Sequence, residues 1–357
     1  MSGLYYAACC QTAFACPRDR EEIADRTARM CRMIEEVVAG YEPFFDVRLL
    51  AFPEFAHAAP VYPDPAVLRA RLALPVPNEH TDAYERVAKK LGCYIQTGTF
   101  IEWDPAYPEV LFNTTCLIGP TGVLSKYRKV NPWIPWELLA SPHDLPEYKE
   151  PLFPVVETEL GKLGVAICYD WLFPEAIREI ALAGAEVIIR ISAYMDPWGT
   201  CSPLEWWTLV NRVRALENMV FVVAVNQGAN RQDYPPFSWP GGSMLVDYDG
   251  RILAQAEPGP GEKVVVGPIA LETLRAERTR RFGHDMLSHL RSEAYTYLRQ
   301  PRFPPANKEA EDPAGIWTDK GVRLRIARGK KKLGFAGQGR ETCHEETASR
   351  VTEEGSA

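Results

Sequence analysis

Short apolar runs alternate with segments of helical periodicity over residues 4–270, and this alternation constrains the fold more than any other feature. The first run, LYYAACCQ at 4–11, precedes a segment at 19–42 whose apolar side chains share one helical face. A helical segment followed by a strand-like run recurs at 174–192 and again at 202–228. Such alternation predicts an α/β fold in which helices cover the sheet.

The remaining elements are less regular. We expect a helical segment at 81–92 and a single strand at 93–103. A hairpin with a Thr-Gly turn is expected at 109–130, and a long loop rich in Pro and Trp at 132–154. A further strand at 46–54 ends in Pro-Glu. Because long ordered loops are often functional, the loop at 132–154 is a candidate to fold over a site.

The character of the chain changes near residue 300. With 357 residues, the chain is long enough for one large domain or two ordinary ones. We assign 1–300 to the main domain and 301–357 to a C-terminal extension, in which PRFPP precedes acidic and basic runs. The extension is expected to be partly irregular or disordered, and its basic run at 323–332 reads as a solvated charge cluster.

Charge and cysteine usage narrow the classes of partner. The net charge of −7 argues against nucleic acid and anionic membranes, and no apolar run reaches the roughly 20 residues of a membrane helix. The N-terminus lacks the basic start of a signal peptide. Nine cysteines are scattered without a CxxC pair, and the histidines show no HExxH spacing. We expect a cytoplasmic protein without a disulfide framework or a metal site.

One cysteine stands where a nucleophile could act. In KLGVAICYDWLFPE, Cys168 ends an apolar strand and precedes a helical segment. Free N–H groups at such a helix start favour negative charge on a thiol. A buried cysteine is more often a small hydrophobe, so this position needs partners: a base for the thiol proton and a cation for the developing oxyanion.

Three charged residues lie in positions to be those partners. Glu54 follows the strand in LLAFPEF, Lys129 ends the hairpin in SKYRKVNP, and Glu137 comes eight residues after Lys129. Each has a structural alternative, because a capping glutamate or a surface lysine is common at a strand exit. Together they provide a base, a cation and a second carboxylate near one thiol.

The order and local sequence of Glu54, Lys129 and Cys168 resemble the Glu-Lys-Cys triad of the nitrilase, or carbon–nitrogen hydrolase, superfamily. The similarity covers about residues 4–300, and Glu137 matches a second, substrate-orienting glutamate of that family. The segments around 127–137 and 184–197 resemble the aliphatic amidase and formamidase branch. Tyr169 and Asp170 stand where true nitrilases usually carry Trp-Glu.

The resemblance implies hydrolysis of a primary amide to a carboxylic acid and ammonia through a cysteine thioester. Cys168 would be the nucleophile, Glu54 the acid and base, Lys129 the oxyanion cation and Glu137 a positioning group, with no cofactor. An N-carbamoyl-amine hydrolase or a nitrilase on the same triad stays open, and so does a catalytically silent interaction subunit.

The resemblance also implies a four-layer α-β-β-α sandwich and a homo-oligomer built from dimers. Aromatic side chains near the triad are candidate substrate contacts, although aromatics are more often core residues. They suggest an acyl group larger than formyl or acetyl, and the candidates are Trp133, Trp136, Tyr169, Trp171 and Tyr194.

Overall fold

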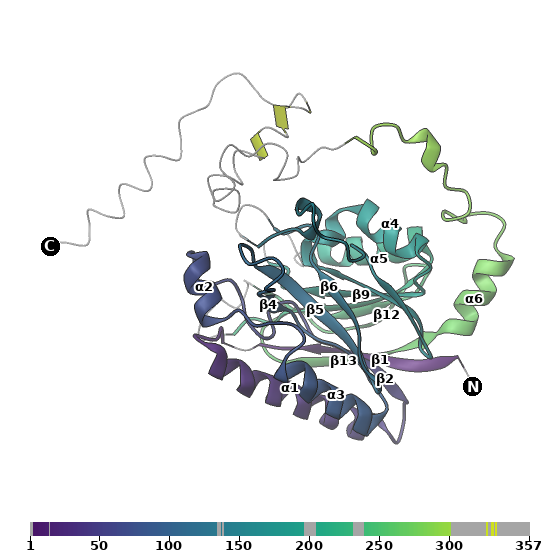
Figure 1. Cartoon of the computed structure of the whole chain (residues 1–357). Helices are drawn as coiled ribbons and strands as arrows, with labels where there is room; N and C mark the ends of the chain where they lie inside the picture. Colours follow the sequence, from purple (N-terminus) through teal and green to yellow (C-terminus); the bar gives the residue numbers. More distant parts are fainter. Residues whose placement is uncertain are drawn as a thin grey trace. The chain divides into compact units, whose positions relative to one another are not determined.

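The computed structural model describes most of the chain, and its strands form two sheets (Figure 1). The described residues are 3–13, 15–133, 137, 139–195, 205–230, 239–300, 326–327, 330–331 and 333. The chain divides into two compact units, Met1–Ser292 and Glu293–Ala357. The predicted irregular extension lies almost entirely outside the described residues.

The first sheet has seven strands in the order β13-β1-β2-β3-β5-β4, with β6 paired to β5. β1, β2 and β3 run parallel, and the other pairs are antiparallel. The strands are β1 (Leu4–Gln11), β2 (Val47–Ala51), β3 (Tyr94–Gln96), β4 (Phe100–Glu102), β5 (Phe112–Gly119), β6 (Gly122–Arg128) and β13 (Lys263–Ala270).

The second sheet has six strands in the order β12-β11-β10-β9-β8-β7, with β8, β9 and β10 parallel. Its strands are β7 (Val155–Thr158), β8 (Gly161–Ile167), β9 (Val187–Ser192), β10 (Phe221–Asn226), β11 (Met244–Val246) and β12 (Ile252–Gln255). Within the described residues the helices are α1 (Arg20–Tyr41), α2 (Pro65–Arg71), α3 (Glu79–Leu91), α4 (Pro174–Leu182), α5 (Trp206–Asn218) and α6 (Leu271–Arg280), with 3-10 turns η1 (Pro142–Asp144), η2 (Cys168–Leu172) and η3 (Ser292–Ala294).

Successive side chains along each strand point to opposite faces of its sheet, and their apolar members form three hydrophobic layers. On β1, Ala7 and Cys9 face the core between the two sheets, whereas Ala8 and Cys10 face the layer under α1 and α3. On β9, Ile189 joins the central core and its neighbour Ile188 joins the layer under α4 and α5. The predicted four-layer α-β-β-α sandwich is therefore confirmed, with α1 and α3 on one outer face and α4 and α5 on the other (Figure 1).

Several predicted elements change in detail. The single strand expected at 93–103 is two strands, β3 and β4, which pair antiparallel with successive parts of β5 and are separated by residues 97–99. The helices α2 and α6 and the strand β7 were not predicted. All three are short, and α6 has no strong apolar face to produce a helical pattern in the sequence.

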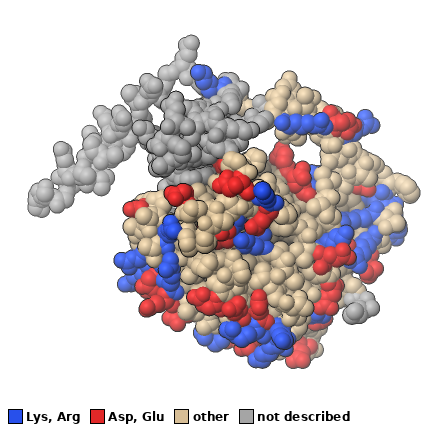
Figure 2. Space-filling model, in the orientation of Figure 1, with Lys and Arg blue, Asp and Glu red and all other residues tan. Residues whose placement is uncertain are grey.

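Charges are mixed on the molecular face in Figure 2, where Lys and Arg lie among Asp and Glu without a large area of one sign. The expected absence of nucleic acid and membrane partners stays a prediction. In the parts of the chain that the structure describes, every helix is too short or too polar to cross a bilayer.

A close backbone approach fixes the turn after β2. A Cβ atom on Gly98 would lie 2.6 Å from the Pro53 carbonyl oxygen and 2.5 Å from the Ala56 side chain. Only glycine allows the segment between β3 and β4 to approach this turn so closely.

We therefore expect Gly98→Ala to lower the free energy of unfolding by about 1–3 kcal/mol, since the added methyl group overpacks the turn. Urea denaturation measures this change. Gly40→Ala in α1 is the matched control, because its added methyl group meets no neighbour within 4 Å and alanine favours the helix. Equal stability of Gly98→Ala and the parent would contradict the proposed packing.

Candidate active site

Three chain turns bring the predicted polar residues together at the exits of strands. Cys168 directly follows β8, Lys129 directly follows β6, and Glu54 lies three residues beyond β2. The parallel strands β2 and β8 belong to different sheets, so this cluster bridges the two sheets at their carboxyl ends. Glu137 joins the cluster from the loop after β6.

Lys129 stands between the two carboxylates. Its Nζ donates to Glu54 Oε1 at 2.7 Å and to Glu137 Oε2 at 2.6 Å, and all three side chains are buried. Burial lowers the pKa of Lys129, but Glu137 and Glu54 together outweigh burial and raise it above its ordinary value. The lysine is therefore a permanent cation at neutral pH. An ammonium has three donors, so one N–H remains for another acceptor.

Asn113 and two backbone amides donate further hydrogen bonds to the carboxylates of Glu54 and Glu137. Asn113 Nδ2 donates to Glu54 Oε1 at 2.9 Å and to Glu137 Oε1 at 2.7 Å. The Ala193 amide donates to Glu54 Oε2 at 2.9 Å, and the Trp133 amide donates to Glu137 Oε2 at 2.8 Å. Sequence reasoning missed Asn113, although an amide side chain inside a fully buried strand was a signal for a polar site.

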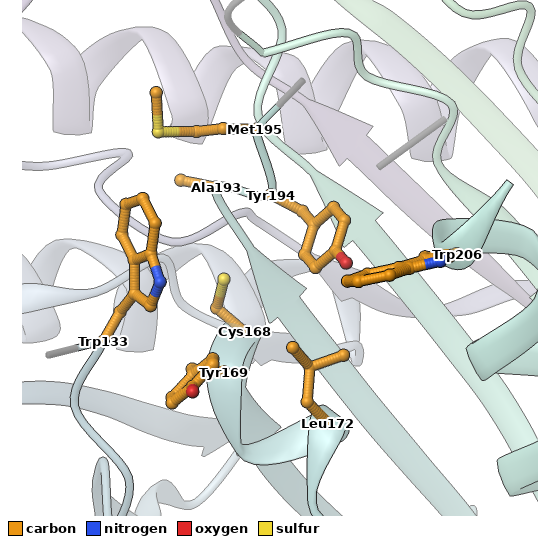
Figure 3. A pocket seen from close by; sticks show the side chains of 8 residues that line it. All are labelled: Trp133, Cys168, Tyr169, Leu172, Ala193, Tyr194, Met195 and Trp206. Carbon is orange, nitrogen blue, oxygen red and sulfur yellow. The ribbon is translucent and has the colours of Figure 1, made fainter. Parts of the chain in front are cut away.

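The backbone at Cys168 is unusual. Its φ of +44° lies in the left-handed region, which non-glycine residues seldom adopt. This conformation ends β8 and turns the chain sharply into η2, with the thiol projecting into the pocket (Figure 3). Such strain in a residue other than glycine often marks a functional position.

The thiol of Cys168 is not poised as a thiolate. Burial and then the Glu54 carboxylate raise its pKa to about 12, with Lys129 opposing them. The expectation that a helix start favours the charged thiol is therefore wrong here: η2 is a five-residue 3-10 turn, and α4 begins only at Pro174. A base must take the proton when the sulfur reacts.

Asp170 holds the turn that carries Cys168. Its Oδ2 accepts from the Tyr127 hydroxyl at 2.7 Å and the Ile167 amide at 2.9 Å. Its Oδ1 accepts from the amide N–H and the side chain of Asn131 at 2.8 and 2.9 Å. Burial raises the pKa of Asp170 to about 6, against the effect of Lys129 and these hydrogen bonds.

A cavity of about 290 Å³ opens over the thiol. Figure 3 shows Cys168 between Trp133 and Tyr194, with Tyr169 and Leu172 on the side of η2 and Met195 opposite them. The lining is completed by Ala193 and by Trp206, the first residue of α5.

Only some of the five aromatic residues predicted as substrate contacts line the cavity. Trp133, Tyr169 and Tyr194 line the cavity. Trp136 lies outside the described residues. Trp171 does not reach the cavity: its indole is fully buried in the layer under α4 and α5 and donates to the Ala166 carbonyl. Adjacent residues in a tight turn point in different directions, which the spacing alone did not reveal.

Trp206 and Met195 are lining residues that the sequence analysis missed. Trp206 falls in the segment at 202–228 that was predicted as a helix and a strand, and Met195 follows β9 without a polar group to mark it. Asn226, the last residue of β10, supports the lining, because its side chain fixes the backbone of Tyr194 through hydrogen bonds of 2.7 and 3.2 Å.

A family model for carbon–nitrogen hydrolases matches residues 6–279. The chain belongs to the carbon–nitrogen hydrolase family. The resemblance inferred from the three sequence segments is thereby confirmed, and so is the prediction of an enzyme that acts on non-peptide carbon–nitrogen bonds.

Relatives and solved structures agree with this family. A formamidase from Bacillus thuringiensis (strain Al Hakam) is 31% identical over 249 residues, which cover 69% of this chain and 68% of the formamidase. Among solved structures, Nit3 of Saccharomyces cerevisiae is 26% identical with a TM-score of 0.63, covering 77% of this chain and 93% of Nit3. A carbon–nitrogen hydrolase from Helicobacter pylori G27 shares the fold, with 20% identity, a TM-score of 0.67 and coverage of 84% and 99%.

We expect Asp170→Asn to lower the free energy of unfolding by about 2 kcal/mol or more, because its NH₂ group would face N–H and O–H donors that now point at a carboxylate. Chemical denaturation followed by tryptophan fluorescence measures this loss. Tyr127→Phe is the matched control, since it removes only one of the four donors and should cost about 1 kcal/mol. A smaller loss in Asp170→Asn than in Tyr127→Phe would refute this role for Asp170.

Proposed function

We propose that this carbon–nitrogen hydrolase cleaves a primary amide to a carboxylic acid and ammonia through a thioester on Cys168. The observation that carries the proposal is the buried Lys129 cation, held by Glu54 and Glu137 beside a thiol that opens into a cavity. This arrangement supplies a base, a nucleophile and an oxyanion site at one place.

In the first half-reaction, the Cys168 sulfur attacks the amide carbonyl carbon and its proton passes to Glu54. Because the thiol pKa is about 12, attack and proton removal by the carboxylate have to be coupled. The new oxyanion accepts from the remaining Lys129 N–H and from the backbone N–H of Tyr169, the residue after the nucleophile.

Glu54 then returns the proton to the nitrogen as the carbon–nitrogen bond breaks, and ammonia leaves. In the second half-reaction, Glu54 takes a proton from water, and the resulting hydroxide attacks the thioester carbonyl. The second tetrahedral intermediate releases the carboxylic acid and restores the thiol. Glu137 orients the Lys129 ammonium and the substrate amide, consistent with its hydrogen bonds to Lys129 and Asn113.

Other functions on this scaffold are less well supported. An N-carbamoyl-amine hydrolase would use the same residues, and the triad alone does not separate it from an amidase. A nitrilase would use Glu54 in the same way to add water to a thioimidate before ammonia leaves, and the similarity to a formamidase favours the amide as substrate. A silent interaction subunit has no need of a buried lysine between two carboxylates, which is costly to maintain.

We also propose that two copies pair through α5. Trp206, Leu209, Val213 and Leu216 are 40%, 56%, 37% and 43% exposed and recur at helical spacing on one face of α5. An exposed apolar stripe of this kind favours a partner surface. A cytoplasmic location is part of the same proposal, supported by the free thiols of all seven cysteines in the described ranges.

We expect Cys168→Ala to fold like the parent, to release no ammonia from primary amides and to form no acyl adduct, because the nucleophile is absent. Circular dichroism checks the fold, an ammonia assay checks turnover, and intact-protein mass spectrometry detects the adduct. Cys31→Ala, a half-buried cysteine of α1, is the control that should keep full activity. Ammonia release by Cys168→Ala would end the thioester proposal.

We expect the enzyme to hydrolyse a primary amide at least about 10²-fold better, in kcat/KM, than the nitrile with the same acyl group, a difference of roughly 2.7 kcal/mol. The physical reason is that the amide already carries the oxygen that Lys129 and the Tyr169 N–H bind. Ammonia release from matched amide and nitrile pairs measures the ratio. Comparable rates for both members of a pair would identify a nitrilase instead.

A further inference from the structure

The cavity over Cys168 is much larger than a small aliphatic amide requires. Its volume is about 290 Å³, whereas an apolar cavity of roughly 150 Å³ is enough to hold benzene. Formamide has only three non-hydrogen atoms, so several water molecules would have to remain beside it. A formyl or acetyl group would therefore leave most of the apolar lining uncovered.

The lining carries no formal charge among the residues that the structure describes. Around Cys168 it consists of aromatic rings and aliphatic side chains, contributed by Trp133, Tyr169, Leu172, Tyr194, Met195 and Trp206. The rings stand on opposite sides of the thiol in Figure 3, with Trp133 facing Tyr194 across the space. Such walls favour a flat apolar group between them.

Two cations lie near the cavity, and neither is among its described lining residues. Lys129 is shared by its two carboxylates. The Arg190 guanidinium lies 5.2 Å from the ring centroid of Tyr194. Arg190 is fully buried, stacks 4.2 Å from the Trp207 ring centroid and donates from Nη1 to Asn211, whereas its Nε and Nη2 have no hydrogen-bond partner among the described residues. Arg190 is not among the described residues that line the cavity, so a carboxylate on the acyl group would lose hydration there without reaching a cation.

We propose that the acyl group of the substrate is uncharged and aromatic, an aryl or arylalkyl group, with Trp206 forming the end of its binding site. This inference rests on the proposed amidase function and specifies its substrate class. Trp206 is the only lining residue contributed by α5, and in Figure 3 it lies beyond Tyr194 as seen from Trp133. It is thus placed to contact the part of the acyl group farthest from Trp133.

The first test is a series of primary amides assayed with the full-length enzyme. Phenylacetamide and 3-phenylpropanamide should exceed acetamide in kcat/KM by at least about 30-fold, as expected for burying one phenyl ring. Acetamide or formamide as the preferred substrate would overturn this inference and leave the amidase function intact. Absence of ammonia from every amide would overturn both.

A second comparison tests the charge of the acyl group. Succinamate and 4-methylpentanamide have the same shape, but only succinamate carries a carboxylate at the far end. We expect 4-methylpentanamide to be favoured by at least about 10²-fold in kcat/KM, since the carboxylate loses its hydration in an uncharged pocket. Equal use of the two amides would contradict an uncharged site.

Trp206→Ala tests the assigned end of the site. The variant should lose about tenfold in kcat/KM for 3-phenylpropanamide and keep its acetamide rate within about twofold, because acetamide does not reach this residue. Leu182→Ala is the matched control, an exposed apolar residue at the end of α4 that lies outside both the cavity lining and the proposed pairing face of α5. Equal losses in both variants, or an unchanged phenyl preference in Trp206→Ala, would reject the role of Trp206.

Binding provides a readout that does not depend on turnover. Titration of 3-phenylpropanamide into Cys168→Ala should quench fluorescence from the tryptophans of the lining and saturate at a concentration at least about tenfold below that of acetamide. Equal affinity for the two amides would contradict the proposed acyl site even if both were hydrolysed by the parent enzyme.

Discussion

The buried ammonium of Lys129 is the interaction on which the rest of the site depends. A lone charge without water is strongly unfavourable, so the cation is tolerated only because Glu54 and Glu137 lie 2.7 and 2.6 Å away. Those carboxylates in turn need donors, which Asn113 and the Ala193 amide supply. Removing one member would leave the others with uncompensated charge, so the cluster behaves as one unit.

The two sheets explain how such a cluster forms from distant parts of the chain. The first sheet delivers Glu54 and Lys129, and the second delivers Cys168 and the Ala193 amide. Apolar side chains between the sheets fix their separation, so the core positions the carboxylate relative to the thiol. Loops supply several residues of the cavity lining, while the residues after the strand ends supply the thiol and the charged groups.

The sequence predicted which polar groups lie together better than it predicted their surroundings. Glu54, Lys129 and Cys168 each follow a strand, and strand order brings such positions together regardless of their separation along the chain. Trp171 and Trp206 were misjudged because the direction of a side chain in a short turn or a first helical residue depends on local backbone angles. The raised pKa of Cys168 was equally hidden, since burial by remote residues causes most of it.

The left-handed backbone at Cys168 makes the residue with the thiol a different one from the residue that best fits the turn. With φ at +44°, glycine would be the residue that fits this turn without strain, yet glycine has no sulfur. Under the proposed function, the position is therefore a local compromise in which the nucleophilic sulfur is retained at the expense of conformational stability. Descendants of this chain that are released from selection for activity should accumulate glycine at position 168. Their folded state would become more stable while the activity is lost.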